Sequence, residues 1–206
     1  MVQSDAIRVA ILNKYGGIWL DADTIILNDK IIKQFQNYEL GMIWEKKRKL
    51  HYISFIYAKN SSILKEWQRQ IIIKVKKCKY FCLNKQNNIA WNNTFKIISF
   101  WNYLGNSIID PLVNNINGKK FFHIDSNNTQ VFPEFKYFQN SSIENMLKYK
   151  LFYFKKRNPL LVLNNTKGLI FLHNSWTPLQ YKNLTVQAFL KEDILLSKLF
   201  LYLLKL

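Results

Sequence analysis

Two carboxylates near the start of the chain, Asp21 and Asp23, have the type and spacing that suggest chemistry. They follow an apolar run at residues 17–20, and alternate side chains of a strand point to the same face, so the pair would share one face. Neighbouring carboxylates repel unless a cation lies between them, and Mg²⁺ or Mn²⁺ binds carboxylate oxygens together with phosphates. Three of the 13 acidic residues, Asp5 included, lie within the first 23 positions, so this segment is the expected chemical centre.

The preceding segment has the pattern of a helix that would position Asp5 and Arg8. Ser4 is a suitable N-cap, and Asp5 would lie in the first turn, where the helix dipole favours an anion. Asp5 and Arg8 are three residues apart and so share one helix surface. Gly16 and Gly17 suit a left-handed C-cap and a tight turn into the strand. The apolar stripe expected to face the core is Ile7, Ala10, Ile11 and Tyr15. A simpler alternative is an exposed Asp–Arg pair beside a strand that happens to end in acids.

The pattern Ser-Asp-x-x-Arg, Gly-Gly-Ile-Trp and Asp-x-Asp within residues 4–27 resembles the DXD-motif glycosyltransferases. This group includes the yeast-type initiating mannosyltransferases of glycosyltransferase family 32, bacterial capsular polysaccharide synthesis proteins and the glucosyltransferase domains of large clostridial toxins. The segment FLHNSW at residues 171–176 is similar to the closing His-x-x-Ser-Trp element of these enzymes. The sequence between the two segments matches loosely, in the manner of the capsular and lipopolysaccharide-modifying members.

The resemblance implies a role for each matched residue. Asp23 would be the direct ligand of Mn²⁺ or Mg²⁺, and Asp21 would contact the metal, the ribose or the sugar of a nucleotide-sugar donor. Asp5 and Arg8 would hold the donor sugar's hydroxyls, and Arg8 or a nearby Lys would add positive charge beside the leaving diphosphate. The resemblance also implies retention at the anomeric carbon. The closing segment would cover the diphosphate and complete the metal shell, with His173 and Ser175 as metal ligands beside Asn174 and Trp176.

An ordinary structural reading of the closing segment is also open. Residues 168–172 have the composition of a buried strand, and a turn commonly follows such a strand. On this reading His173 and its neighbours would have no chemical role.

The expected fold is α/β: a GT-A-like, Rossmann-like parallel sheet of the nucleotide-diphospho-sugar transferase type, in one catalytic domain over residues 1–206. Relatives carry a strand–helix–strand section before the Ser-Asp-x-x-Arg element, whereas Met1 stands three residues before Ser4. The expectation is therefore an N-terminally truncated domain: a fragment, a shortened reading frame, or a chain that holds the base differently. Truncation would uncover a strand edge and a helix face, which predicts low solubility and weak nucleotide-sugar binding.

Composition and charge exclude several classes of protein. With 49% hydrophobic and 16% aromatic residues the chain is not disordered, and it contains neither a membrane-spanning stretch nor a secretory signal, so a cytoplasmic location is expected. The net charge of +17 has three explanations: nucleic-acid binding, an AT-rich genome, and attraction to anionic lipid at the inner face of the bacterial inner membrane. The lysines are scattered and no nucleic-acid motif is present, so the last two are favoured and no nucleic acid is expected as a partner.

The C-terminal and middle segments give weaker signals. Residues 186–206 are expected to form one amphipathic, largely apolar helix, which would either lie in the membrane interface or dock on the sheet or a partner. A strand is expected at 52–58 and a helix at 61–74, and the aromatic and amide residues of 86–110 are candidates for acceptor contact. Asp110 is a turn or helix cap and a distant candidate for a sugar contact. The remaining expectations are structural histidines and reduced thiols without zinc: His51, His123, Cys78 and Cys82.

The function expected from these observations is a metal-dependent transferase that moves a sugar from a UDP- or GDP-sugar to a bacterial surface polysaccharide or a lipid-linked glycan. An inactive remnant or accessory protein is the first alternative. A basic nucleic-acid-binding module is the second.

Overall fold

A computed structural model describes residues 2–46, 49–84, 103–114, 116, 120–129, 141–164 and 167–204. The fold is mixed α/β, which confirms the predicted fold class. The chain divides into two compact units, each with its own sheet and core. Unit 1 contains Met1–Asp21 and Ile31–Ser126, and unit 2 contains Ala22–Lys30 and Asn127–Leu206. The single catalytic domain expected over the whole chain stays a prediction.

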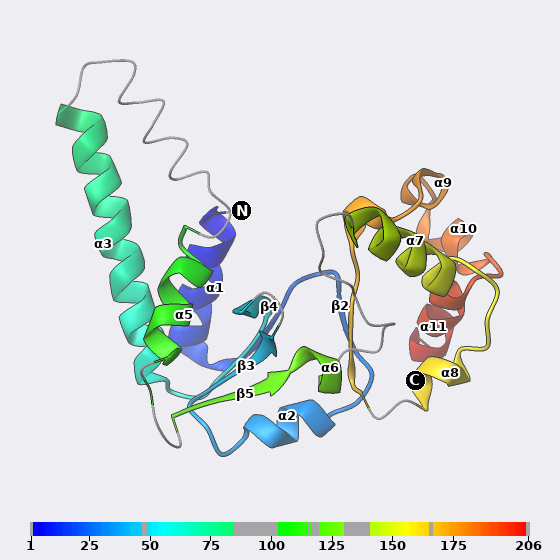
Figure 1. Ribbon diagram of the computed structural model, residues 1–206, viewed down its shortest axis with the longest axis horizontal. Helices are drawn as coiled ribbons and strands as arrows, with labels where there is room; N and C mark the ends of the chain where they lie inside the picture. The colour runs from blue at the N-terminus through cyan, green and yellow to red at the C-terminus, as the bar shows by residue number, and fades with distance from the viewer. Residues whose placement is uncertain are drawn as a thin grey trace. The chain divides into compact units, whose positions relative to one another are not determined.

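Unit 1 is built on a four-stranded sheet with the order β1-β4-β3-β5 (Figure 1). The strands are β1 (Gly17–Leu20), β3 (Leu40–Glu45), β4 (Leu50–Ala58) and β5 (Phe121–Asp125). β4 pairs antiparallel with both β1 and β3, and only β3 and β5 are parallel. The expectation of a parallel sheet is therefore wrong. The physical reason lies in the connection from β3 to β4, because residues 46–49 are too few for a crossover.

Helices cover both faces of this sheet (Figure 1). α1 (Val2–Tyr15), α3 (Ser62–Asn84) and α5 (Asn106–Asn114) pack on one face, where their apolar residues form one core with β3 and β4. On the other face α2 (Lys30–Phe35) places Phe35 against Phe55 of β4, with ring centroids 5.7 Å apart. The strand expected at 52–58 and the helix expected at 61–74 are thus confirmed, as longer elements.

The orientation of α1 is a correction to the sequence analysis. Ile7, Ile11 and Tyr15 are 53%, 42% and 72% exposed, and Ala10 is exposed as well. The predicted core stripe is therefore wrong, because the buried face of α1 carries Asp5, Arg8, Val9 and Leu12. Ser4 is also not an N-cap. It lies inside α1, where its Oγ accepts a hydrogen bond from Arg8 at 2.9 Å.

Unit 2 has a two-stranded antiparallel ribbon of β2 (Thr24–Ile26) and β6 (Leu169–Phe171). β6 is buried throughout, as expected for residues 168–172. Tyr149 and Tyr153 of α7 lie in the core of the unit, together with Ile170 of β6. The helical elements are α7 (Ser141–Tyr153), α8 (Leu160–Leu163), the short 3₁₀ helix η1 (Asn174–Trp176), α9 (Leu179–Lys182), α10 (Val186–Leu190) and α11 (Leu195–Leu204), while α6 (Ser126–Thr129) begins at the last residue of unit 1.

The C-terminal segment forms two helices, so the single helix expected over 186–206 is wrong. α10 ends at Leu190, and residues between the helices turn the chain so that the Leu195 amide donates to the Lys155 carbonyl at 2.9 Å. Ser197 Oγ fixes the two helices by donating to the Phe189 carbonyl at 2.6 Å. α11 then buries Leu195, Leu196 and Leu199 in the core of unit 2. Within the described residues, none of the helices has the length and apolar character that a membrane span requires.

Candidate functional site

The candidate site in unit 1 is an arginine buried between two carboxylates. Arg8 Nη2 lies 3.3 Å from Asp5 Oδ1, one turn earlier on α1, and Nη1 lies 3.4 Å from Asp21 Oδ1 at the end of β1. The side chains of Arg8 and Asp5 are only 5% and 1% exposed, whereas that of Asp21 is 34% exposed. A buried guanidinium is stabilised when carboxylates neutralise it and accept its hydrogen bonds. The cluster therefore presents one carboxylate, Asp21, to solvent from a fixed position.

The elements around Arg8 explain this placement. Its Nη1 also donates to the Ile53 carbonyl of β4, and its guanidinium lies over the Trp19 ring, 5.4 Å from the centroid. Trp19 Nε1 donates to Asp21 Oδ1 at 2.8 Å, and the Asp21 amide donates to the Ser54 carbonyl at 2.9 Å. The Gly16–Gly17 turn that brings β1 next to α1 has φ of 65° and 96°, as the sequence predicted. The local sequence thus holds Asp21 by both its backbone and its side chain.

Asp5 is a buried carboxyl group with unused hydrogen-bonding capacity. Burial raises its pKa to about 6 and the nearby Asp21 also raises it, whereas Arg8 lowers it. Within the described part of the chain Asp5 Oδ2 has no hydrogen-bond partner. A Cβ on Gly105 would lie 3.0 Å from this oxygen, so the glycine permits a close approach. An unsatisfied buried oxygen is costly, which marks this position as one that a ligand hydroxyl could complete.

The two carboxylates of the DXD segment do not share one strand face, so that expectation is wrong. β1 ends at Leu20, the chain turns at Ala22 and Asp23, and β2 begins at Thr24 in a different sheet. The alternation rule applies only within one strand, and the chain leaves the first sheet before it reaches Asp23. Asp21 belongs to unit 1 and Asp23 to unit 2.

Within unit 2, the ribbon brings Asp23 beside the closing segment. Thr24 pairs with Phe171, and the next residue pair continues the register because the Leu172 amide donates to the Asp23 carbonyl at 2.8 Å. Asp23 and His173 were singled out from segments far apart in the sequence. The pairing of β2 with β6 places both at the same end of one ribbon.

The closing segment packs around a buried tyrosine. The His173 amide donates to Tyr149 Oη at 3.1 Å, and the His173 ring lies 4.2 Å from the Trp176 ring. Burial raises the pKa of Tyr149, and the charge of Asp23 acts in the same direction. Asn174 and Ser175 are exposed in η1, so they are available to a ligand.

Asp23 and the closing segment offer oxygen donors, which suit a hard divalent cation that also binds phosphate. Mg²⁺ is commonly held by one or two carboxylates, with waters and substrate phosphates filling the remaining positions. No group of three His, Cys, Asp or Glu side chains within the described residues could hold a metal ion by itself.

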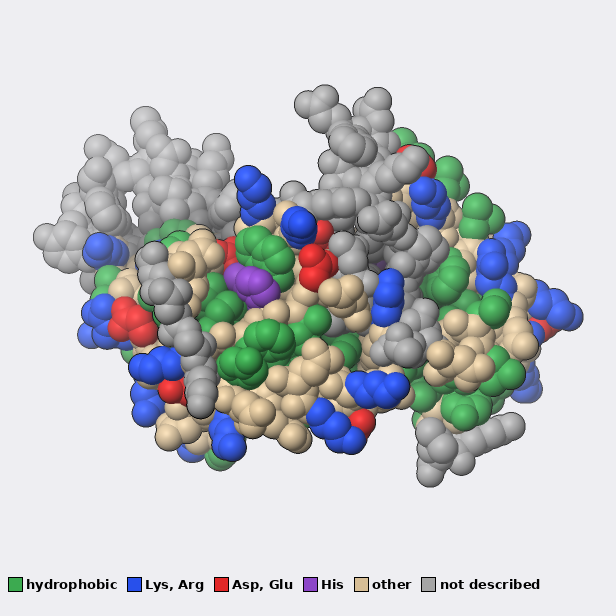
Figure 2. Space-filling model, turned by 60° about the horizontal axis from the view of Figure 1, so that its bottom comes forward, with side chains coloured by type: hydrophobic (Ala, Val, Ile, Leu, Met, Phe, Trp, Pro, Cys, Tyr) green, Lys and Arg blue, Asp and Glu red, His purple; other side chains and the backbone are tan. Residues whose placement is uncertain are grey.

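A second polar cluster involves the histidines that were expected to be structural. His51 is 1% exposed, and its Nδ1 lies 2.7 Å from Asp110 Oδ1, while Asn106 donates to Asp110 Oδ2 at 3.1 Å. His51 Nε2 lies 3.3 Å from His123 Nδ1, and both histidines line a pocket of about 360 Å³ with Phe121 and neighbouring residues. Burial and His51 lower the pKa of His123. Figure 2 shows a histidine at the surface among hydrophobic side chains.

The structure describes only some of the remaining site residues that were predicted from the sequence. Residues 85–102, which hold most of the suggested acceptor segment, lie outside the described residues, as do the side chains of Cys78 and Cys82. Two residues of the clusters, Trp19 and Tyr149, were not among the predicted site residues. Trp19 could have been found from the sequence, because it is only two residues before Asp21 and an indole N–H can donate to a nearby carboxylate. Tyr149 carries no local signal.

These features define an α/β protein with a buried carboxylate–guanidinium cluster beside its first strand. The chain belongs to the capsular polysaccharide synthesis protein family, whose model matches residues 1–160. The matched range includes Asp5, Arg8, Asp21 and Asp23 and ends before the closing segment. Comparison with curated proteins and with solved structures gives no match.

Proposed function

We propose that the protein is a metal-dependent glycosyltransferase of capsular polysaccharide synthesis. It transfers a sugar from a UDP- or GDP-sugar to a capsular polysaccharide, a lipopolysaccharide or a lipid-linked glycan. The observation that carries the proposal is the fixed position of Arg8 between Asp5 and Asp21, 3.3 and 3.4 Å from the two carboxylates. Such a cluster holds oxygens at set positions, which is what a hydroxyl-rich ligand requires.

The chain's own residues bind and orient the donor in this proposal. Asp21, held by Arg8 and Trp19, accepts hydrogen bonds from a hydroxyl of the sugar or the ribose. Asp5, with a pKa of about 6, accepts or donates a hydrogen bond through Oδ2 according to its protonation. Two carboxylates already neutralise Arg8, so its main role is to hold Asp5 and Asp21 in position.

The proposed cation is Mn²⁺ or Mg²⁺, with Asp23 as its direct carboxylate ligand and His173 and Ser175 of the same unit as further candidates. When bound, the cation neutralises the charge that develops on the leaving nucleoside diphosphate. Asn174 and Ser175 are exposed and offer donors to phosphate oxygens, and the ring of Trp176 offers an apolar surface to the donor. Retention at the anomeric carbon stays a prediction.

The test is a screen of UDP- and GDP-sugars for Mn²⁺-dependent release of the sugar or the nucleoside diphosphate. We expect release by the unchanged chain, and a loss of about 100-fold or more in Asp23→Asn, because neutralising a direct ligand weakens binding of the cation. Asp193→Asn is the matched control, because Asp193 is an exposed aspartate that pairs with Lys156 at 2.7 Å on the surface of unit 2.

The outcomes separate the proposal from its alternatives. Full release by Asp23→Asn would contradict the metal assignment. A folded chain that releases no sugar from any donor, with or without Mn²⁺, would favour the inactive or accessory protein.

A further inference from the structure

Helix α7 exposes aliphatic side chains on the face opposite the core. Ile143, Leu147 and Leu151 are 65%, 51% and 52% exposed. They are spaced by four residues, so they form one stripe along the helix. A helix that merely covers a core normally turns such residues inward and its polar residues outward.

The buried face of α7 is already filled by other residues. Asn145, Tyr149 and Tyr153 are 3%, 1% and 0% exposed and are also spaced by four. They follow the aliphatic stripe by two positions, which is a rotation of about 200° around the helix. The core contacts of Tyr149 and Tyr153 therefore fix the orientation of α7 and force the aliphatic stripe outward.

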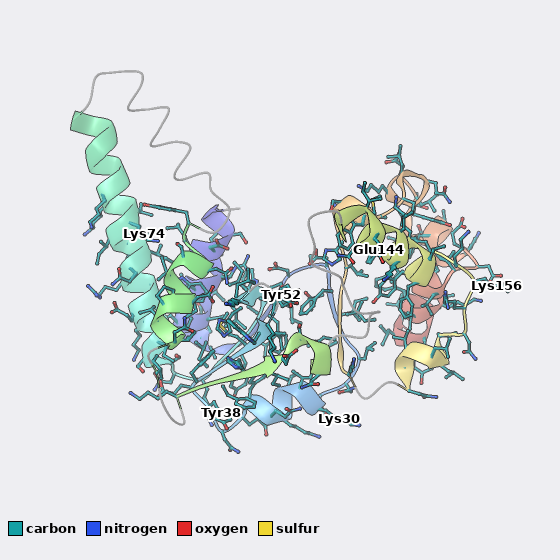
Figure 3. All side chains as sticks on the ribbon, in the orientation of Figure 1. Lys30, Tyr38, Tyr52, Lys74, Glu144 and Lys156 are labelled. Atoms are coloured by element: carbon teal, nitrogen blue, oxygen red, sulfur yellow. The ribbon has the colours of Figure 1, made fainter. Side chains whose placement is uncertain are left out.

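Basic side chains accompany this stripe. Residues 141–158 contain five basic residues and one acidic residue, Glu144. Lys148 pairs with Glu144 at 3.0 Å and Lys156 with Asp193 at 2.7 Å, and Lys155, Lys156 and Arg157 are exposed directly after the helix. Glu144 and Lys156, labelled in Figure 3, mark α7 and the segment that follows it.

We propose that the exposed face of α7 is a docking surface for an anionic lipid membrane. An apolar stripe with neighbouring cations matches the bilayer interface, where aliphatic side chains enter the acyl boundary and cations meet lipid phosphates. Each basic residue near an anionic surface adds to the attraction. A second copy of the chain fits the face less well, because two such segments would bring like charges together.

This surface differs from the C-terminal segment that the sequence suggested for membrane contact. α11 buries Leu195, Leu196 and Leu199 in the core of unit 2, so those side chains are not available to lipid. The stripe on α7 is independent of the proposed transferase activity, and its test needs no sugar donor.

The test is co-sedimentation of the full chain with vesicles of phosphatidylcholine alone or with a quarter phosphatidylglycerol. We expect binding only to the anionic vesicles, and a loss of about tenfold or more in Leu147→Ser/Leu151→Ser, because each serine removes apolar area from the contact. Lys155→Gln/Lys156→Gln should also weaken binding, more at low than at high salt. The matched control is Ile7→Ser/Ile11→Ser on α1, which changes two exposed isoleucines of unit 1 and should leave binding unchanged.

Three outcomes would overturn the proposal. The first is equal binding to both vesicle types, and the second is unchanged binding after the α7 substitutions. The third is a dimer, detected by analytical ultracentrifugation, that the α7 substitutions dissociate while no vesicle binding occurs. Circular dichroism checks that each variant folds, which we expect because the substituted side chains are exposed.

Discussion

Asp5 combines the cost of burying a carboxyl group with the proposed binding of a ligand hydroxyl. Its carboxyl group is almost fully buried beside a cation and a second carboxyl, and the net effect raises its pKa to about 6. Spacing alone predicted its contact with Arg8, because residues three apart share a helix surface. Its burial could not be predicted in the same way, since it depends on Gly105, which follows Asp5 by a hundred positions.

The raised pKa of Asp5 predicts a dependence of stability on pH. The folded-state pKa of about 6 exceeds the ordinary value of 3.8, so the folded protein binds this proton more tightly than the unfolded chain. The resulting stabilisation is full below pH 3.8 and is lost as the pH rises through 6, by about 3 kcal/mol in total. Asp5→Asn should lack this loss.

Urea denaturation of both proteins at pH 4.5 and pH 7.5 measures the effect. Relative to the unchanged protein, Asp5→Asn should gain stability between the two pH values, and Asp193→Asn should not show this gain. An equal stability difference at both pH values would show that Asp5 has an ordinary pKa.

At the scale of elements, α1 shows where pattern reasoning succeeds and where it fails. The helix, its glycine turn and the strand after it were predictable, because local residues fix them. The buried face of α1 could not be predicted. Its apolar residues can be read as two different stripes along the helix, and amphipathic patterning places charged residues such as Asp5 and Arg8 on the solvent side. The ion pairs of Arg8 with Asp5 and Asp21 make the charged face the buried one.

Contact between α2 and the sheet gives a second prediction at this scale. A Cβ on Gly41 of β3 would lie 2.2 Å from Cδ1 of Phe35, whose ring is fully buried. Gly41→Ala should therefore displace the ring and reduce the free energy of unfolding by about 1–3 kcal/mol, measured by urea denaturation.

A double-mutant cycle identifies the cause. Phe35→Leu reduces the side chain that the new methyl group meets, so the two substitutions together should cost less than the sum of the single ones. Additive costs would mean that the lost stability comes from the strand itself and not from the contact with Phe35.

At the scale of the whole molecule, the two units share an interleaved chain. Unit 2 takes β2 from residues 22–30 and the rest of its elements from 127 onward. The sequence suggested one domain, because no linker-like change of composition separates the units. The DXD segment lies where the chain first passes from one unit to the other.

Because the chain is interleaved, we expect that residues 1–160, the range that matches the family, are not sufficient for unit 2 to fold. A fragment of residues 1–160 keeps β2 and α7 but lacks β6 and α11, which bury Ile170, Leu195 and Leu199 against Tyr149 and Tyr153. We expect this fragment to lose the protection of α7 amides in hydrogen exchange while unit 1 amides stay protected. Protected α7 amides in the fragment would contradict the described core.

The pairing of β2 with β6 also has a consequence during synthesis. β2 ends at Ile26, and its partner strand begins only at Leu169. A ribosome adds about 5–20 residues per second, so β2 is without β6 for roughly 7 to 30 s during synthesis. During that time Ile25 and Ile26 lack their partner strand, and an unpaired apolar edge can pair with another chain. Synonymous codons that slow translation between the two strands would lengthen this exposure without changing a single residue of the protein.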